Sequence, residues 1–131
     1  MRRQEQSEQI QLISWCEWQG KMYPILRRIY HIPNGGKRTR VEAAIFKRMG
    51  VKAGVPDLFL PAGENGKHGL YIELKSDTGR PSKAQLDWGE YLMREGYEVA
   101  VCRGWMQAAD TIVRYLGLPA RVSPLYNGGD E

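Results

Sequence analysis

The sequence has few of the residues that hold small secreted domains or zinc-binding domains together. Its 131 residues include only two cysteines, Cys16 and Cys102, and these do not form a CxxC pair. Two cysteines by themselves cannot build a disulfide framework or a four-ligand zinc site. We therefore expect two free thiols with no metal-binding or cross-linking role.

Long apolar runs are also missing. No stretch approaches the roughly 18 apolar residues that a membrane-spanning helix needs, and the N-terminal MRRQEQSEQIQ has no apolar core of a signal peptide. We expect a soluble protein with no membrane partner. The chain is long enough for one domain with a modest core, and its 42% hydrophobic and 26% charged residues are ordinary for a globular protein.

Acidic residues are scarce in one part of the chain. Between Lys21 and Lys52 there are nine Lys or Arg residues and a single acid, Glu42, and the whole chain carries a net charge of +4. A basic segment of this kind is either a solvated face or a surface that binds phosphates. Charge alone leaves both interpretations open.

Hydrophobic periodicity and turn residues predict an α/β domain. The predicted helices cover residues 4–19, 39–49, 82–95 and 106–116, and the predicted strands cover residues 57–60, 70–75 and 97–102. Residues 23–32 fit neither pattern, and residues 31–38 read as a turn. The first two strands form a hairpin, whereas a helix connects the second strand to the third, so that pair should be parallel. The sequence thus predicts a mixed central β-sheet flanked by helices in one domain, residues 1–118, followed by a flexible tail, residues 119–131.

The hairpin brings three charged residues together if its strands pair symmetrically about the loop. Leu60 then faces Leu70, Asp57 faces Glu73, and Lys75 lies on the same side of the sheet two residues further on. Directly opposed residues have β-carbons about 4.5–5.5 Å apart, and like charges in such positions are destabilising. A divalent cation between the two carboxylates would relieve the repulsion, and Mg²⁺ favours carboxylates together with waters and phosphates.

The same residues also allow a structural interpretation. Asp57 could cap the turn before its strand, and Glu73 and Lys75 could form a solvated ion pair. A register shifted by one residue would place the two acids on opposite faces of the sheet. Pro56 favours the symmetric register, because proline fits the first position of a strand rather than its interior.

Longer sequence segments resemble a known family. Pro56-Asp57, fifteen intervening residues and Glu73-Leu74-Lys75 match the PD-(D/E)XK pattern of metal-dependent nucleases. The segments IPNGGKR (32–38), GVKAGVPDLFLP (50–61), HGLYIELK (68–75) and GYEVAVCRGWMQA (96–108) closely resemble the VRR-NUC family, the virus-type replication and repair nucleases. The resemblance runs from about Glu5 to Leu116.

The resemblance implies a restriction-endonuclease-like core and Mg²⁺-dependent hydrolysis of DNA phosphodiesters, with Mn²⁺ as a substitute. Asp57 and Glu73 match the metal-binding acids and belong to the catalytic set with Lys75. The backbone carbonyl of Leu74 is implied as a further metal ligand. A glutamate of the first helix completes the metal shell, and Glu8 matches it best, although Glu5 lies one turn earlier and stays an alternative.

Two further groups of residues have both functional and structural interpretations. Gln85 matches a catalytic-set glutamine on the helix that follows the lysine strand, but it also stands three residues after Ser82, the spacing of a capping box. Basic and polar residues around the predicted turn could present donors and charges to DNA phosphates, or could simply be solvated. The candidate DNA-binding residues are Asn34, Lys37, Arg38, Arg40 and Lys52.

These observations favour a DNA endonuclease that is selective for branched DNA, such as four-way (Holliday) junctions, in DNA repair or recombination. Stand-alone relatives resemble junction resolvases that work as symmetric dimers, so the resemblance implies a homodimer in the cytoplasm of a bacterial or phage-infected cell. The main alternative is a catalytically inactive DNA-binding module with the same fold. A remoter one is a small basic domain that binds an acidic protein.

Overall fold

The computed structural model describes residues 3–34 and 39–128. Its elements, in chain order, are α1 (Arg3–Gln19), η1 (Pro24–Arg28), β1 (Tyr30–His31), α2 (Arg40–Arg48), β2 (Leu58–Leu60), β3 (Leu70–Lys75), α3 (Lys83–Arg94), β4 (Glu98–Arg103), α4 (Trp105–Leu116) and η2 (Ala120–Val122). None of the described helices is long and apolar enough to cross a membrane.

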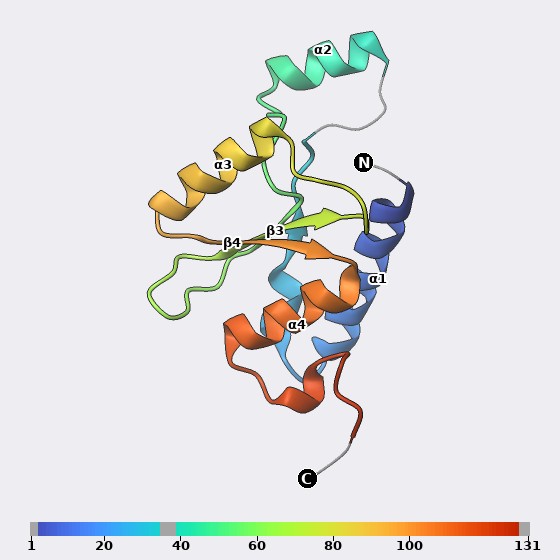
Figure 1. Cartoon of the computed structure of the whole chain (residues 1–131), viewed down its shortest axis with the longest axis vertical. Helices are drawn as coiled ribbons and strands as arrows, with labels where there is room; N and C mark the ends of the chain where they lie inside the picture. The colour runs from blue at the N-terminus through green and yellow to red at the C-terminus, as the bar shows by residue number, and fades with distance from the viewer. Residues whose placement is uncertain (1–2, 35–38, 129–131) are drawn as a thin grey trace.

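The four strands form one mixed sheet in the order β1-β2-β3-β4 (Figure 1). β1 and β3 both run antiparallel to β2, and β3 runs parallel to β4. The predicted α/β class is confirmed, and the predicted parallel pair is present. The hairpin register is also as predicted, because Leu60 pairs with Leu70 and Phe59 pairs with Tyr71.

The connection between β2 and β3 has a tight turn at its tip. The backbone groups of Glu64 and Lys67 exchange two hydrogen bonds of 2.8 and 3.2 Å. Between them Asn65 and Gly66 have φ values of 52° and 77°, which suit the type I′ turns of β-hairpins. The tip therefore closes the hairpin at the end opposite Asp57.

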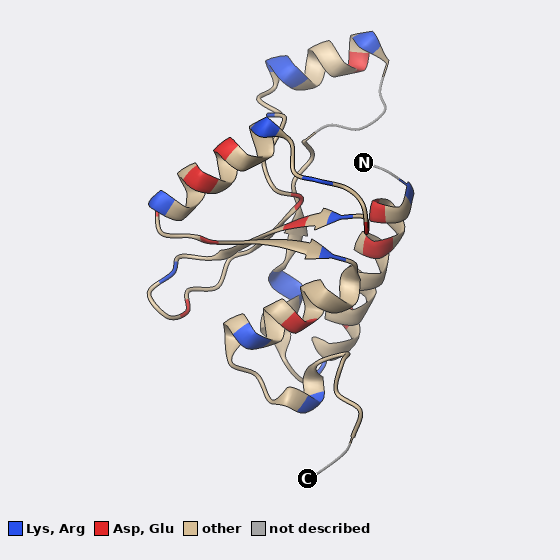
Figure 2. Ribbon diagram, viewed as in Figure 1, with Lys and Arg blue, Asp and Glu red and all other residues tan. Residues whose placement is uncertain are grey.

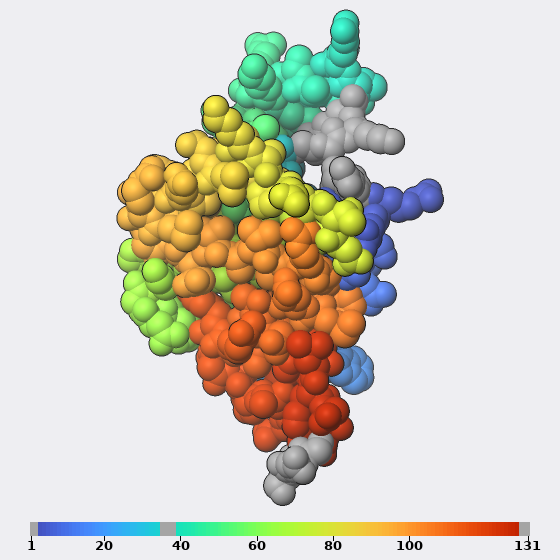
Figure 3. Space-filling model, viewed as in Figure 1, coloured from blue at the N-terminus to red at the C-terminus, as the bar shows by residue number. Residues whose placement is uncertain are grey.

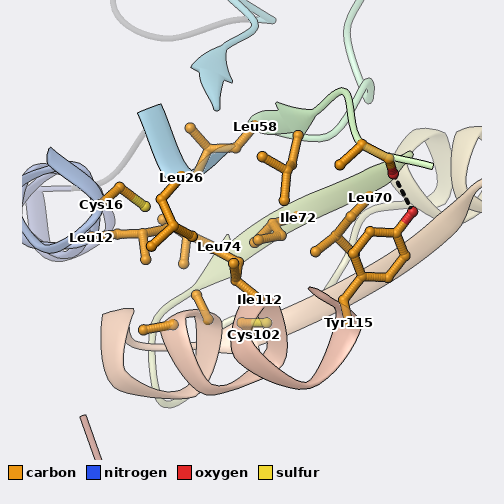
Figure 4. Packing of buried hydrophobic residues seen from close by; sticks show 14 residues of the cluster. Leu12, Cys16, Leu26, Leu58, Leu70, Ile72, Leu74, Cys102, Ile112 and Tyr115 are labelled. Atoms are coloured by element: carbon orange, nitrogen blue, oxygen red, sulfur yellow. Dashed lines mark hydrogen bonds between the residues drawn. The ribbon is translucent and has the colours of Figure 1, made fainter. Parts of the chain in front are cut away.

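One face of the sheet carries the hydrophobic core. Alternate residues of β2 and β3 point to this face, where α1, η1 and α4 cover them (Figure 4). Each fully buried leucine there contributes about 1.5–3 kcal/mol of hydrophobic stabilisation. The residues that are essentially inaccessible to solvent include Leu12, Cys16, Leu26, Leu58, Leu60, Leu70, Ile72, Leu74, Cys102 and Ile112. Cys16 and Cys102 are free thiols, as expected.

The opposite face carries the aromatic and charged residues that alternate with the core residues. Phe59 and Tyr71 lie in ring contact with centroids 4.4 Å apart. α3 packs over part of this face, where a β-carbon on Gly89 would stand 3.8 Å from Val99 of β4. The sheet is therefore covered by two helices on one side and by α3 on the other (Figure 1).

Local sequence signals set the ends of the helices. The Thr39 side chain accepts a hydrogen bond from the Glu42 backbone and caps α2. Ser82 and Gln85 form a complete capping box at the start of α3, as their spacing allows. Gly117 ends α4 in the left-handed conformation, with φ of 68°, which glycine adopts without steric cost.

α2 stands apart from the rest of the fold. None of its residues is buried, and the helix forms a protrusion at one end of the molecule (Figures 1 and 3). Val41, Ile45 and Met49 lie four residues apart and are 69%, 49% and 73% exposed. An apolar stripe at helical spacing thus faces outward in the single chain.

Two segments lie outside the helices and strands that the sequence predicts. Residues 23–32, which fitted neither pattern, form η1 and the two-residue edge strand β1. Within the segment predicted as a flexible tail, residues 119–128 are described and pack on α4. Val122 of η2 is buried, and the Ser123 hydroxyl donates to the Asp110 carboxylate of α4.

Candidate active site

Asp57 lies at the start of β2 and is buried. Continuing the observed β2–β3 register by one pair places it opposite Glu73, on the face with α3. Its Oδ2 accepts a 2.8 Å hydrogen bond from the Leu74 backbone N–H. Its carbonyl accepts from the Ile32 N–H at 2.8 Å and lies 2.9 Å from His31 Nδ1. Strand pairing on both sides therefore fixes the position of this carboxylate.

Glu73 is buried in the middle of the sheet, with 4% of its surface exposed. One carboxylate oxygen, Oε2, accepts a 2.9 Å hydrogen bond from Gln85 Nε2 and lies 3.7 Å from Lys75 Nζ. The other oxygen, Oε1, is buried and has no hydrogen-bond partner within the described part of the chain. A buried acceptor without a partner is costly in a native protein.

The environment raises the pKa of Glu73 from its ordinary value to about 8. The largest cause is burial, which disfavours the charged carboxylate, and the second is the negative charge of Asp57. The nearby Lys75 ammonium acts in the opposite direction, and the Glu5 carboxylate raises the pKa further. The site thus holds more negative charge than its single lysine balances.

Lys75 is held on the same face as the two acids. Its side chain is only 11% exposed, and its ammonium forms a buried ion pair with Glu73. Buried ion pairs contribute little net stability, because removing both charges from water is costly. The position of Lys75 therefore calls for an explanation other than stability.

The carboxylate pair suits a small divalent cation. The unpartnered Glu73 Oε1 and the neighbouring Asp57 provide two hard oxygen donors at a site with excess negative charge. Among the described residues, no group of three or more His, Cys, Asp or Glu side chains is arranged to hold a metal. Mg²⁺ does not require such a cage, because it commonly binds through one or two carboxylates and completes its shell with waters and substrate phosphates. The residues present therefore fit the ion.

The structure separates the two candidate glutamates of α1. Glu8 Oε2 accepts a 2.7 Å hydrogen bond from the Trp105 N–H, so its carboxylate caps the start of α4. Glu5 is buried, and its Oε2 accepts a 3.2 Å hydrogen bond from Ser76 at the end of β3. Of these two glutamates, only Glu5 is among the charges that raise the Glu73 pKa. These contacts place Glu5 at the end of β3, the strand that carries Glu73 and Lys75, and Glu8 at the start of α4.

Gln85 contacts both the start of α3 and the carboxylate pair. Its Oε1 accepts a 2.8 Å hydrogen bond from the Ser82 N–H, which completes the capping box of α3. Its Nε2 donates to Glu73. One side chain therefore links the start of α3 to the carboxylate pair.

The candidate DNA-binding residues do not form one group in the structure. Asn34 is partly buried, and its Nδ2 donates to the Val55 carbonyl and, at 3.4 Å, to Asp57 Oδ1. Arg40, at the start of α2, and Lys52 are exposed. Lys37 and Arg38 lie outside the described residues. Asn34 thus supports Asp57, whereas Arg40 and Lys52 are accessible to a ligand.

Sequence reasoning missed Arg103 at the end of β4. It pairs in register with Lys75, and its guanidinium binds carbonyls of the loop after β3. In Figure 2 the basic ends of β3 and β4 lie beside the acidic first turns of α1. The predicted parallel pairing was the signal that could have found it, because extending that pairing to residue 103 places it beside Lys75.

Comparison with known proteins gives the same family from sequence and from structure. The model of the VRR-NUC domain matches residues 3–106. A solved structure described as a VRR_NUC domain protein is similar with a TM-score of 0.75 and 35% sequence identity, covering 90% of this chain and 92% of that one. No curated protein matches. The site described above lies wholly within the matched segment, and the chain belongs to the VRR-NUC domain family, a membership consistent with a nuclease that binds DNA.

Proposed function

We propose that the protein is a metal-dependent deoxyribonuclease, an endonuclease that hydrolyses DNA phosphodiester bonds with Mg²⁺ and accepts Mn²⁺ in its place. The observation that carries this proposal is the buried Glu73 carboxylate. It lies beside Asp57 and Lys75, and its Oε1 has no hydrogen-bond partner among the described residues. Buried acids of this kind are characteristic of functional sites.

Asp57, Glu73 and the Leu74 carbonyl hold the ion in this proposal. Glu5 replaces Glu8 as the helix glutamate that would contribute to the site, because it is buried and its charge acts on Glu73. When bound, the ion lowers the pKa of a coordinated water and stabilises the charge that develops on the phosphate. The Leu74 N–H holds Asp57 in place by its hydrogen bond to Oδ2.

Lys75 and Gln85 complete the catalytic set. Lys75 would orient the attacking water through its ammonium donors, and its positive charge would favour loss of the water's proton to solvent, since the ammonium sits beside the carboxylate pair. Gln85 holds Glu73 Oε2, so Oε1 would be the oxygen left for the ion. Both residues would thus help to align the reacting groups before the phosphodiester is attacked.

The substrate in this proposal is branched DNA, such as a four-way (Holliday) junction, and the working form is a homodimer. The outward apolar stripe of α2 supports self-association, because a single chain leaves it uncovered. A two-fold dimer presents two active sites to a branched substrate of matching symmetry. This activity belongs to DNA repair or recombination in the cytoplasm of a bacterial or phage-infected cell.

A cleavage panel tests the function. Wild type should cut four-way DNA in Mg²⁺ or Mn²⁺ but not in EDTA, and should cut linear duplexes less. Glu73→Ala and Lys75→Ala should abolish cleavage while DNA binding in EDTA persists. Glu95→Ala is the matched control, because Glu95 is exposed at the end of α3, and it should cut normally.

Each unexpected outcome of the panel has a defined meaning. Normal cleavage by a clean Glu73→Ala preparation contradicts the mechanism. Wild-type protein that binds DNA tightly and cuts none of the substrates is the inactive DNA-binding module instead. Equal cleavage of linear and four-way DNA would contradict the selectivity for branched DNA but would support the nuclease activity.

A further inference from the structure

A short loop after β3 touches two residues of the site. Ser76 donates its N–H to Glu5, and the loop turns back at Gly79. A β-carbon on Gly79 would stand 3.6 Å from Glu5 Oε2 and 3.6 Å from Lys75 Cδ. The backbone of the loop therefore packs against both side chains, and its path fixes where they lie.

Arg103 closes this loop from the neighbouring strand. Its Nη1 donates to the carbonyl oxygens of Ser76 and Gly79, both at 2.6 Å, and lies 3.3 Å from the Asp77 carbonyl. These bonds join the two ends of the loop to one charged group. Hydrogen bonds from a charged donor are roughly twice as strong as neutral ones, so the guanidinium is the main tie that holds the loop closed.

The backbone of Arg103 is itself fixed beside Lys75 by the strand register. The two residues are partners in the parallel β3–β4 register, and the Arg103 N–H donates a 2.6 Å hydrogen bond to Gln107 Oε1 of α4. The guanidinium therefore reaches the loop from a rigid part of the sheet. Positions on such elements are set more tightly than positions on the loop alone.

We propose that Arg103 is a positioning residue for hydrolysis: by clamping the loop Ser76–Gly79, it sets Glu5 and Lys75 against the carboxylate pair. This inference rests on the proposed nuclease function. Arg103 acts through the loop, because Nη1 is engaged by its carbonyl oxygens. The clamp also fixes the start of the segment that leads to α3 and Gln85.

The central test compares Arg103→Ala with Arg94→Ala, which removes an exposed arginine at the end of α3. Arg103→Ala should lower kcat about 100-fold, the scale expected when reacting groups are misplaced by about 1 Å, with KM for DNA nearly unchanged. Arg94→Ala should leave kcat unchanged. Millimolar methylguanidine should restore part of the lost kcat, whereas methylammonium should not.

Arg103→Lys distinguishes the clamp from a simple positive charge. Lysine keeps the charge, but its nitrogen stops about one bond short of the position of Nη1. The variant should therefore give an intermediate kcat. A wild-type kcat for Arg103→Lys would mean that only the charge matters and would overturn the clamp.

Amide hydrogen exchange provides a readout that is independent of activity. Without DNA or metal, Arg103→Ala should speed exchange at Ser76 and Gly79, while exchange in the centre of β3 stays slow. Unchanged exchange at both amides overturns the proposal even if the activity falls. An inactive wild type with faster exchange in the variant refutes the nuclease function but leaves the clamp.

Two other outcomes would also overturn the proposal. A large rise in KM with a flatter salt dependence assigns Arg103 to a DNA phosphate. Lower stability with an unchanged kcat per folded molecule assigns it to the fold alone. If Arg103→Ala does not fold, Gly79→Ala disturbs the same loop, because its new β-carbon would stand 2.9 Å from Ser76 Oγ, and it should also lower kcat.

Discussion

The surroundings of Glu73 disfavour the charged form of its carboxylate unless a cation binds it. Burial and the adjacent Asp57 favour its protonated form, and the Lys75 ammonium only partly offsets them. A metal ligand must be deprotonated, so binding of the proposed ion would release the proton that burial favours on Glu73. The same residue should therefore make stability, and the affinity for the proposed ion, depend on pH.

The pH dependence has a defined sign. The folded-state pKa of Glu73 is about 8, above the unfolded value of about 4.3, so the metal-free folded protein binds the extra proton. The contribution of this group to the free energy of unfolding is complete below about pH 4.3 and is lost as pH rises towards 8. In urea denaturation, the free energy of unfolding of wild type relative to that of Glu73→Gln should therefore fall as pH rises through this window.

Metal binding gives a second measurement of the same group. With a pKa of about 8, calorimetry in buffers of different ionisation enthalpy should show about 0.9 proton released per Mn²⁺ bound at pH 7 and about 0.1 at pH 9. The exposed-site variant Glu95→Gln should behave as wild type in both experiments. A proton release that does not vary with pH would contradict the raised pKa.

The two roles of Gln85 can be separated by substitution. Ser82→Ala removes the cap of α3 but keeps the donor to Glu73, so it should cost about 1 kcal/mol of stability with near-normal cleavage. Gln85→Met removes both bonds and should in addition lower cleavage about 10–100-fold, the usual cost of losing a ligand's supporting hydrogen bond. Equal cleavage by the two variants would leave Gln85 with the cap alone.

Among the elements, α2 is the helix whose stability is not accounted for by packing within its own chain. A nine-residue helix without buried residues gains little from tertiary packing, and isolated helices of that length are marginal in water. Its outward apolar stripe of Val41, Ile45 and Met49 is typical of a helix that packs on a partner. The proposed homodimer supplies that partner.

A charge placed on the stripe tests this interpretation. Ile45→Asp should weaken self-association about 100-fold, because it buries an unpaired carboxylate in the interface. Ala43→Asp adds the same charge on the opposite side of α2 and should leave association unchanged. Sedimentation equilibrium at micromolar protein measures both, and a wild type that is wholly monomeric with and without four-way DNA would contradict the dimer.

The sequence predicted the hairpin register because alternation and the turn constrain it together. Pro56 just before β2 and the alternating apolar residues Leu58, Leu60 and Leu70 exclude a register shifted by one residue, which would turn these leucines away from the core. It did not separate Glu5 from Glu8, because both lie on one helix within a turn, and the contacts made by Ser76 and Trp105 decide between them. Those contacts span 71 and 97 residues, so no local pattern records them.

At the scale of the whole molecule, the basic segment between Lys21 and Lys52 predicts how the affinity for DNA depends on salt concentration. Arg40 and Lys52 are exposed, and each lost phosphate contact should reduce the slope of log affinity against log salt by about 0.9 on duplex DNA. Arg40→Ala and Lys52→Ala should each weaken binding and flatten the slope. Arg121→Ala, an exposed site in η2, should change neither in a fluorescence titration.

The hairpin that builds the site also offers a place to extend the molecule. Its register is set by paired strands, while the tip at Asn65 and Gly66 lies at the far end from Asp57. Extra residues spliced into that tip lengthen a solvent-facing turn without sliding one strand past the other. The tip is therefore suited to carry a dye or a surface tether for single-molecule work, with the chemical end of the hairpin left free.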